Sequence, residues 1–251
     1  MISSVVIPAY QKVDLLKECL ERFETQTVED FEVVVVSDGC DEVNSFLTSY
    51  NAKFSLQHFD TGYDGFGVAL ACNKGIYEAN GEQIIIIGPD CLVTPKFIEL
   101  HQKYFELGLL IAGDIVTVEI DEFGCEEPIM PELREVFRTL FEPDGLEAME
   151  FGLGTEHLVF SGNISFAKSD AYRLGGFDVA NFLNEGGSDT DFARRWLLYY
   201  GRLKFIRNPV GHVGIMSNVY GSVRSKSEWP RDRLAELSNR LAPVVPFIKE
   251  V

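Results

Sequence analysis

The chain has 251 residues, of which 46% are hydrophobic and 24% are charged. This composition supplies a substantial apolar core and excludes an intrinsically disordered protein. The 22 basic and 39 acidic residues give a formal net charge of −17, and so negative a surface repels phosphate backbones and anionic lipid, which argues against general nucleic-acid binding. The charge is uneven, because ten basic and only three acidic residues lie between Arg194 and Arg240. We therefore expect an anionic ligand near this stretch, or one bridged by a cation.

The first part of the chain alternates short β-branched runs with helical patterns. The runs at residues 4–9, 31–37 and 83–88 lack alternation, which is typical of strands buried on both faces of a parallel sheet. Apolar residues recur at helical spacing in residues 13–25 and 67–80. This order predicts a doubly wound α/β fold with ligand chemistry at the carboxyl ends of the strands.

The middle of the chain continues with a helix, a strand and an acidic excursion. Thr94 suits an N-cap and Pro95 the first position of a helix that runs through Tyr104. A strand is predicted at residues 109–118. Twelve acidic and two basic residues lie in residues 114–150, which favours a solvated acidic surface, with a helix around residues 132–141.

The last part of the chain shows further helices and a strand. The predicted elements are a helix at residues 169–174 that stops at two glycines, a loop at 177–187, a helix from about Asp189 to Tyr200, a strand at 203–208, a loop bearing His212 and a last helix at 231–241. We expect one domain over residues 1–251, in three parts at 1–113, 114–215 and 216–251.

The cysteines and the N-terminus bear on the cellular compartment. The five cysteines are scattered and include no CxxC pair, so they fit neither a disulfide framework nor a structural zinc site. The N-terminus lacks the pattern of a signal peptide, and no run approaches the roughly 20 apolar residues that a bilayer requires. We expect a cytoplasmic location and no transmembrane segment.

Carboxylates stand at predicted strand ends and at a helix start. Asp38 and Asp90 each follow a buried strand, where a rigidly held carboxylate can accept hydrogen bonds from a base or ribose, or ligate a hard cation. Both also suit turns, because Gly39 follows the first and Pro89 precedes the second. Mg²⁺ or Mn²⁺ commonly uses only one or two protein carboxylates and takes its other ligands from phosphate and water.

The helix start near Asp189 carries two acids with different expected roles. Ser188 and Asp191 have the spacing of a capping box, which favours a structural role for Asp191. Asp189 lies beside free backbone donors, which we expect to lower its pKa and keep it ionised as a potential general base.

Of the four histidines, His212 is singled out because small residues flank it. With Asp90 it would complete a cation site, and by itself it would be a polar loop residue. His58, His101 and His157 lie in segments without an evident chemical partner and are expected to be ordinary.

These segments together resemble a known enzyme family. Residues 4–39 and 73–90 resemble the nucleotide-binding half of family 2 glycosyltransferases of the GT-A fold. Residues 160–178, 186–201 and 211–213 resemble the acceptor half of the same class, especially in galactosyltransferase-type and polypeptide-GalNAc-transferase-type enzymes. The resemblance covers nearly the whole chain up to Val213. It implies a single Rossmann-like, doubly wound mixed sheet flanked by helices. It also implies a nucleotide-sugar-binding half at 1–113, an acceptor half at 114–215 and a C-terminal flap and helix at 216–251.

The resemblance also implies roles for particular residues. The donor site would comprise the following residues: Pro8, Ala9, Tyr10, Asp38, Asn73 and Asp90. Asp38 would accept a hydrogen bond from the uracil or other pyrimidine ring, and Asn73 would help to close the nucleotide pocket. Asp90 stands at the last acid of the DxD metal motif and His212 at the third metal ligand. The acceptor-loop signature would be Gly175, Gly176, Phe177 and Asp178, and Asp189 matches the catalytic base of inverting enzymes.

The chain departs from the family pattern at three positions. Gly88 replaces the first acid of the DxD motif, Ser188 replaces the first acid of the ED pair, and Cys72 replaces the arginine of the Arg-Asn-x-Gly motif. These changes affect donor identity and metal affinity more than the fold.

The function implied is transfer of a sugar from a nucleotide-diphosphate donor, a UDP-sugar, to a hydroxyl of a saccharide or other acceptor. A divalent cation, Mn²⁺ or Mg²⁺, would neutralise the leaving group, and Arg224 and Lys226 on the flap would add phosphate contacts. The incomplete motifs leave open a catalytically degenerate sugar-nucleotide-binding protein. A nucleotidyltransferase is disfavoured, because the N-terminal segment lacks a basic, glycine-rich triphosphate loop.

Overall fold

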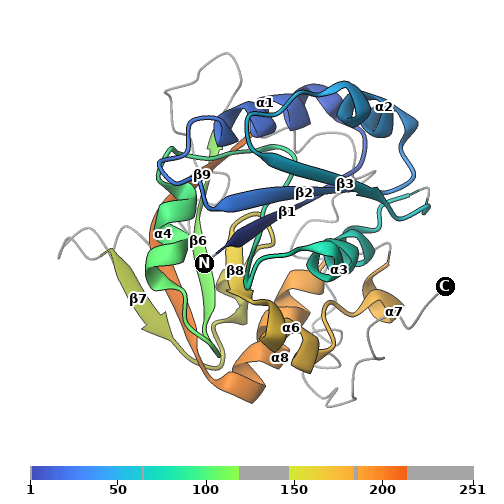
Figure 1. Ribbon diagram of the computed structural model, residues 1–251. Helices are drawn as coiled ribbons and strands as arrows, with labels where there is room; N and C mark the ends of the chain where they lie inside the picture. Colours follow the sequence, from blue (N-terminus) through green and yellow to red (C-terminus); the bar gives the residue numbers. More distant parts are fainter. Residues whose placement is uncertain (1, 64, 119–146, 184–185, 214–251) are drawn as a thin grey trace.

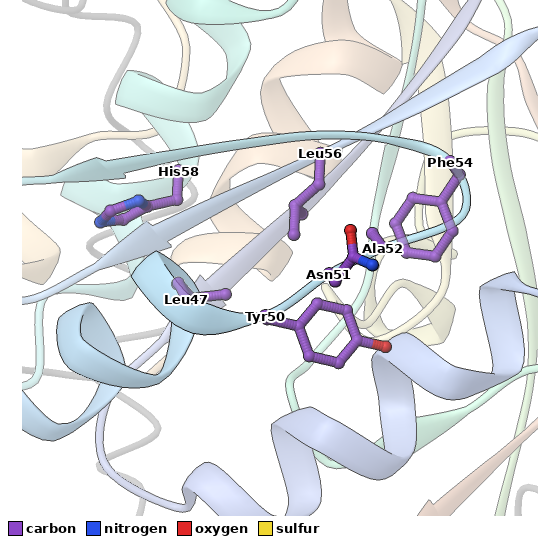
Figure 2. A pocket seen from close by; sticks show the side chains of 7 residues that line it. All are labelled: Leu47, Tyr50, Asn51, Ala52, Phe54, Leu56 and His58. Carbon is purple, nitrogen blue, oxygen red and sulfur yellow. The ribbon is translucent and has the colours of Figure 1, made fainter.

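The computed structural model describes residues 2–63, 65–118, 147–183 and 186–213, and these residues share one mixed β-sheet flanked by helices (Figure 1). The strands are β1 (Ser3–Ala9), β2 (Phe31–Ser37), β3 (Ser55–Asp60), β4 (Gln83–Ile86), β5 (Cys91–Leu92), β6 (Leu110–Val118), β7 (Ala148–Phe151), β8 (Ile164–Ala167) and β9 (Leu203–Val213). The helices are α1 (Val13–Phe23), α2 (Asp41–Ser49), α3 (Val68–Glu78), α4 (Phe97–Tyr104), α6 (Lys168–Leu174), α7 (Val179–Phe182) and α8 (Ser188–Tyr200), with a 3₁₀ turn at Glu156–Leu158.

The sheet is parallel at one end and mixed at the other. Its strand order is β3-β2-β1-β4-β8-β6-β9-β5, and β7 also pairs with β9. β1, β2, β3 and β4 run parallel, whereas β8 lies antiparallel to both β4 and β6. The predicted mixed, doubly wound α/β fold is confirmed, and the second half of the described chain joins the same sheet as the first.

The helices cover both faces of the sheet, because each central strand is apolar on both sides. Val33 and Val35 of β2 belong to the core cluster that α1, α2 and α4 share, whereas Val34 and Val36 belong to the cluster under α3, α6 and α8. Figure 1 shows α1 and α2 on one side of the strands and α3, α6 and α8 on the other. Burial on both faces explains the absence of alternation in these runs.

Several element boundaries differ from the predictions, and three of the differences have a local cause. Helix α4 begins at Phe97 with Lys96 as its N-cap, because residues 95–96 form a turn in which the Phe97 amide donates to the Thr94 carbonyl. The loop predicted at 177–187 contains the short helix α7, whose N-cap is Asp178. His212 lies in β9 and not in a loop, because β9 continues beyond residue 208 through a register shift opposite β6.

Other expectations lie outside the described residues. These are the helices predicted at 132–141 and 231–241, the flap residues Arg224 and Lys226 and most of the acidic excursion. The division of the chain into three parts stays a prediction. None of the helices in the described ranges is long and apolar enough to span a bilayer. The four described cysteines, Cys19, Cys40, Cys72 and Cys91, are free thiols.

Close packing of α3 on β1 sets the distance between that helix and the sheet. A Cβ added to Gly75 would lie 2.3 Å from Cγ1 of Val6 and 3.3 Å from Cγ2 of Val36. No side chain fits there without a shift of the helix. Gly75 therefore lets α3 approach the centre of the sheet, which fixes where its first turn stands.

We expect Gly75→Ala to lower the free energy of unfolding by about 1–3 kcal/mol, the usual cost of overpacking a core. Chemical denaturation measures this change. The matched control is Gly152→Ala, where an added Cβ would lie 4.0 Å from its nearest neighbour, the Gly201 carbonyl oxygen, and we expect a change below about 0.5 kcal/mol. Equal stability of the two variants would contradict the close approach.

Candidate active site

The predicted donor residues gather where β1, β2 and β4 end. β4 pairs with β1 only as far as Val6, so β1 runs three residues further, through Pro8 and Ala9. The Asp38 amide, just after β2, donates to the Ala9 carbonyl at 3.1 Å. Because parallel strands end at the same edge of a sheet, Tyr10, Asp38 and the segment leading to Asp90 share that edge.

The Asp38 carboxylate is buried and joins three segments. Its Oδ2 accepts a hydrogen bond from the Gly67 amide at 3.0 Å, and its Oδ1 accepts one from the Thr61 hydroxyl at 3.0 Å. A Cβ on Gly67 would lie 3.2 Å from Oδ1. The carboxylate therefore holds the end of β3 and the start of α3 around itself, a larger role than the surface turn that Gly39 alone would suggest.

Burial raises the pKa of Asp38 from its ordinary 3.8 to about 6. The hydrogen bonds from Thr61 and Gly67 lower it and the nearby charge of Asp60 raises it, but burial is the larger effect. The ionised carboxylate is thus only partly compensated by its neighbours.

Asp60, at the end of β3, is a second carboxylate near Asp38, and the sequence patterns did not single it out. Its Oδ1 accepts from the Gly62 amide at 2.5 Å and the Gly39 amide at 3.2 Å, and its Oδ2 accepts from Asn44. These donors outweigh burial and lower the pKa of Asp60. An acid closing the strand run SLQHFD was the available signal. Asp60 shapes the loop after β2, which carries Asp38.

Asp90 follows β4 and is paired with a cation. Its Oδ2 accepts from the Lys12 ammonium at 2.9 Å, and a Cβ on Gly88 would lie 2.7 Å from its Oδ1. A side chain at Gly88, the residue that replaces the first acid of the DxD pattern, would therefore have to displace the Asp90 carboxylate from this position.

The backbone brings His212 to the neighbourhood of Asp90. In the antiparallel pairing of β5 with β9, His212 stands opposite Cys91, the residue that follows Asp90. Asp90 and His212 are 122 positions apart in sequence, and the sheet brings the backbones of these two predicted metal ligands near one another. The described residues contain no group of three or more His, Cys, Asp or Glu side chains placed to hold a metal ion.

Asp189 lies in the first turn of α8 and is held from two sides. Its Oδ1 accepts from the Thr190 amide at 2.8 Å and its Oδ2 from the Ser161 amide at 3.2 Å. The expected lowering of its pKa is wrong: burial raises the pKa of Asp189 more than these backbone donors lower it. A carboxylate with a raised pKa is a stronger base, which favours proton abstraction.

The expected capping box at Ser188 and Asp191 is also wrong. Ser188 is the first helical residue, its predecessor Gly187 is the N-cap, and no side-chain cap bond forms. Gly187 adopts φ 101°, a left-handed conformation that suits glycine. Asp191 instead accepts from Arg195 at 2.8 Å, and Arg195 also donates to the Leu174 carbonyl at 3.0 Å. This pair fixes α8 against the end of α6.

Asn73 connects α3 to the Gly175–Asp178 segment. Its Nδ2 donates to the Phe177 carbonyl and its Oδ1 accepts from the Phe177 amide, both at 2.8 Å and both buried. Through these reciprocal bonds, a residue predicted to close the donor pocket holds the predicted acceptor loop against the nucleotide-binding half.

The Gly175–Asp178 segment is shaped by its own chemistry. Gly175 and Gly176 have φ values of 77° and 69°, so both end α6 in the left-handed conformation. Phe177 is buried and stacks on Phe192 with ring centroids 4.5 Å apart. Asp178 accepts from the Asn181 amide at 3.1 Å and caps α7. These residues build a rigid loop, and their contact with an acceptor stays a prediction.

His101, expected to have no partner, is buried between two polar side chains. Its Nδ1 lies 2.8 Å from the Ser165 hydroxyl and its Nε2 lies 3.0 Å from Asn163 Oδ1. Burial lowers the pKa of His101 to about 4, so it is neutral near pH 7. This histidine belongs to the packing of α4 against β8.

A few intervening residues connect the four residues predicted to take part in chemistry: Asp38, Asp90, Asp189 and His212. The charges of Asp38 and Asp189 both act on the buried Cys72 thiol of α3 and, after burial itself, raise its pKa. Ser161 donates to Asp189, and a Cβ on the adjacent Gly162 would lie 3.6 Å from the Cys91 sulfur. One end of the sheet therefore carries Asp38, Asp90 and Asp189, with the backbone of His212 beside them.

Comparison with known proteins agrees with the fold. The family model described as Glycosyl transferase family 2 matches residues 4–170. The chain belongs to glycosyltransferase family 2. The matched region covers β1 through β8 and the start of α6. Most of the galactosyltransferase-like resemblance, at residues 160–178, 186–201 and 211–213, lies beyond it.

A validoxylamine A glucosyltransferase of Streptomyces hygroscopicus subsp. jinggangensis is 28% identical over 214 residues, which cover 76% of this chain and 50% of the relative. The structure of Staphylococcus aureus TarS 1-349 in complex with UDP-GlcNAc has a TM-score of 0.62 at 17% identity and covers 82% of this chain and 56% of that one. A mannosyltransferase from Pyrobaculum calidifontis in complex with GDP-Man and Mn²⁺ has a TM-score of 0.57 at 19% identity, with coverages of 82% and 54%. These structures confirm the GT-A fold. The matched part of this chain covers half or less of the length of these curated relatives.

The raised pKa of Asp38 predicts how the free energy of unfolding changes with pH. Its pKa is about 6 in the folded protein against 3.8 ordinarily, so between these values the folded state binds more protons than the unfolded state. Stability is therefore lost as pH rises from about 4 to 6. In denaturation at pH 4 and pH 7, Asp38→Asn should lose less stability than the wild type, with a difference of up to about 3 kcal/mol at 1.4 kcal/mol per pH unit. Parallel pH profiles would refute the raised pKa.

Proposed function

We propose that this protein transfers a sugar from a nucleotide-diphosphate donor to a hydroxyl group of an acceptor. The observation that carries the proposal is the gathering of Asp38, Asp90 and Asp189 at one end of the sheet in a family 2 glycosyltransferase. These carboxylates suit three separate tasks: recognition of a base, neutralisation at a diphosphate, and removal of a proton.

The donor that best suits Asp38 is a uridine nucleotide. An ionised carboxylate accepts the N–H of a uracil ring, and Asp38 is rigidly placed beside the ends of β1 and β2. Pro8, Ala9 and Tyr10 would form the wall of the nucleotide pocket at the end of β1. The TarS structure that resembles this chain holds UDP-GlcNAc, which supports a UDP-sugar as the first donor to test.

A divalent cation is the proposed cofactor, with Asp90 and His212 as its ligands. One carboxylate and a neighbouring histidine, completed by phosphate oxygens, are a sufficient donor set for Mn²⁺ or Mg²⁺. When bound, the cation would stabilise charge on the departing diphosphate. In the described structure the Asp90 carboxylate pairs with Lys12, so the cation must compete with an ammonium group for that oxygen.

Asp189 is the proposed general base of an inverting transfer. Its carboxylate is fixed by two backbone amides, and burial raises its pKa, which increases its strength as a base at neutral pH. Removal of the acceptor proton on the face opposite the leaving group would invert the anomeric centre.

The proposed acceptor site includes the loop formed by Gly175, Gly176, Phe177 and Asp178, in the galactosyltransferase-like arrangement. The Asn73 bonds to Phe177 would hold this loop at a fixed distance from the donor half. The acceptor would be a saccharide or another hydroxyl compound. Arg224 and Lys226 would add phosphate contacts from the flap, and the protein would act in the cytoplasm.

A catalytically degenerate sugar-nucleotide-binding protein is the second candidate. The specific observation in its favour is that Gly88 and Ser188 stand where the family motifs carry acids. Such a protein would bind the donor but would not release nucleoside diphosphate in the presence of an acceptor.

Removal of the Asp189 carboxylate should separate transfer from donor binding. Release of UDP from a UDP-sugar, measured with a saccharide acceptor panel, should fall at least about 100-fold in Asp189→Asn, because a positioned general base contributes roughly that much or more. Calorimetric affinity for UDP should change less than about threefold. Asp14→Asn, at an exposed position of α1, is the matched control. Turnover surviving in Asp189→Asn would remove this residue from the base role, and no release by the wild type would favour the degenerate binder.

Removal of the Asp90 carboxylate should abolish the metal dependence of donor binding. Calorimetry of UDP with the wild type should show tighter binding with Mn²⁺ than with EDTA, and Asp90→Ala should bind UDP equally in both, because the cation has lost its carboxylate ligand. Equal affinity of the wild type with and without Mn²⁺ would defeat the cation proposal.

A further inference from the structure

The segment between β1 and α1 adopts a costly backbone conformation. Gln11 has φ 56° and Lys12 has φ 51°, and these are the two non-glycine residues with positive φ in the described chain. A left-handed conformation is unfavourable for residues that carry a Cβ, and such strain persists only where the surroundings enforce it. Two such residues in succession stand at the end of β1, where the donor site is proposed.

Lys12 is also a poor choice for the start of a helix. It is the N-cap of α1 and makes no side-chain cap bond, whereas Ser, Thr, Asp or Asn would satisfy a free amide there. Its positive charge adds to the positive end of the helix dipole. Local stability therefore disfavours lysine at this position for three separate reasons, and local rules are broken in this way mainly at functional sites.

The strained turn sends the Lys12 ammonium to Asp90. The Nζ atom donates to Oδ2 at 2.9 Å, and the two side chains are only 22% and 13% exposed. This ion pair joins the end of β1 to the segment after β4, across 78 positions of sequence. It engages a carboxylate that is proposed to bind the donor and its cation.

An anionic ligand needs a cation at this end of the sheet. The chain carries a net charge of −17, and the Asp38, Asp60, Asp90 and Asp189 carboxylates are gathered here. A diphosphate placed among them would be repelled unless positive charge lies within a few ångströms. An ammonium group with three donors and a flexible stem can exchange one oxygen partner for another with little movement of the backbone.

We propose that Lys12 is a built-in cation that binds the diphosphate of the donor, and that Asp90 holds its ammonium in place before the donor arrives. This inference rests on the proposed function and adds a residue to the donor site. The left-handed turn at Gln11 and Lys12 fixes the direction of the side chain. When the donor binds, the ammonium exchanges the Asp90 carboxylate for a phosphate oxygen, and the carboxylate becomes accessible to a divalent cation.

The test is calorimetry in EDTA, with UDP and uridine as probes. The wild type should bind UDP without metal, and Lys12→Met should bind UDP about tenfold or more weakly, the loss expected for a charge-assisted hydrogen bond. Its affinity for uridine, which lacks phosphate, should change less than about twofold. Lys12→Arg should retain most of the UDP affinity. Lys17→Met, on the exposed face of α1, is the matched control and should bind both probes as the wild type does.

A second variant separates ligand binding from mere support of the fold. Asp90→Asn should raise the affinity for UDP in EDTA, because it frees the Lys12 ammonium and removes a repelling charge. If the ion pair were only structural, Asp90→Asn and Lys12→Met would weaken binding of UDP and uridine alike, which would overturn the inference. If Lys12→Met fails to fold, the affinities of Asp90→Asn for UDP and uridine still test the inference.

The outcomes distinguish this inference from the proposed function. If the wild type binds no UDP, GDP or dTDP with or without Mn²⁺, the proposed function fails and the inference falls with it. If it binds a nucleoside diphosphate only with Mn²⁺, or if Lys12→Met binds as tightly as the wild type in EDTA, only the inference is overturned.

Discussion

Parallel pairing of β1 with β2 and β4 is the constraint on which the candidate site depends. Each pairing joins strands whose β-branched side chains are buried on both faces, so that separating the strands would expose a continuous apolar surface. With the register fixed, the residues that follow the three strands must meet at one edge. Asp38 and Asp90 are therefore placed by the core rather than by their loops, which gives them the rigidity that recognition of a small ligand requires.

The second half of the site is attached to this edge by a few specific contacts. The pairing of β8 with β4 places the preceding loop so that the Ser161 amide donates a hydrogen bond to the Asp189 carboxylate. Asn73 holds Phe177, and Arg195 joins α8 to the end of α6. Each contact ties an element of the predicted acceptor half to an element fixed by the sheet. The distance between donor and acceptor positions is thus set by side-chain hydrogen bonds within the core.

The strands and helices of the first half could be predicted because their patterns are local: β2 has the predicted bounds and β1 differs by one residue. The family resemblance supplied the candidate site positions, but their electrostatics depend on tertiary contacts that no motif contains. Burial raises the pKa of Asp189, where backbone donors were expected to lower it, and Asp191 pairs with Arg195 instead of forming the expected capping box. His212, flanked by small residues, was predicted to lie in a loop, whereas pairing with β5 and β6 extends the strand.

The buried carboxylates suggest what a ligand would supply. For both Asp38 and Asp189, burial raises the pKa more than the surrounding donors lower it, so the ionised forms are under-compensated by the protein alone. The N–H of a base at Asp38 and the hydroxyl of an acceptor at Asp189 would each add the missing hydrogen bond. Asp90 differs, because Lys12 already compensates it. Donor binding would therefore relieve a desolvation cost at Asp38 but disrupt an ion pair at Asp90, and the phosphate must offer Lys12 an equivalent partner for binding to be favourable.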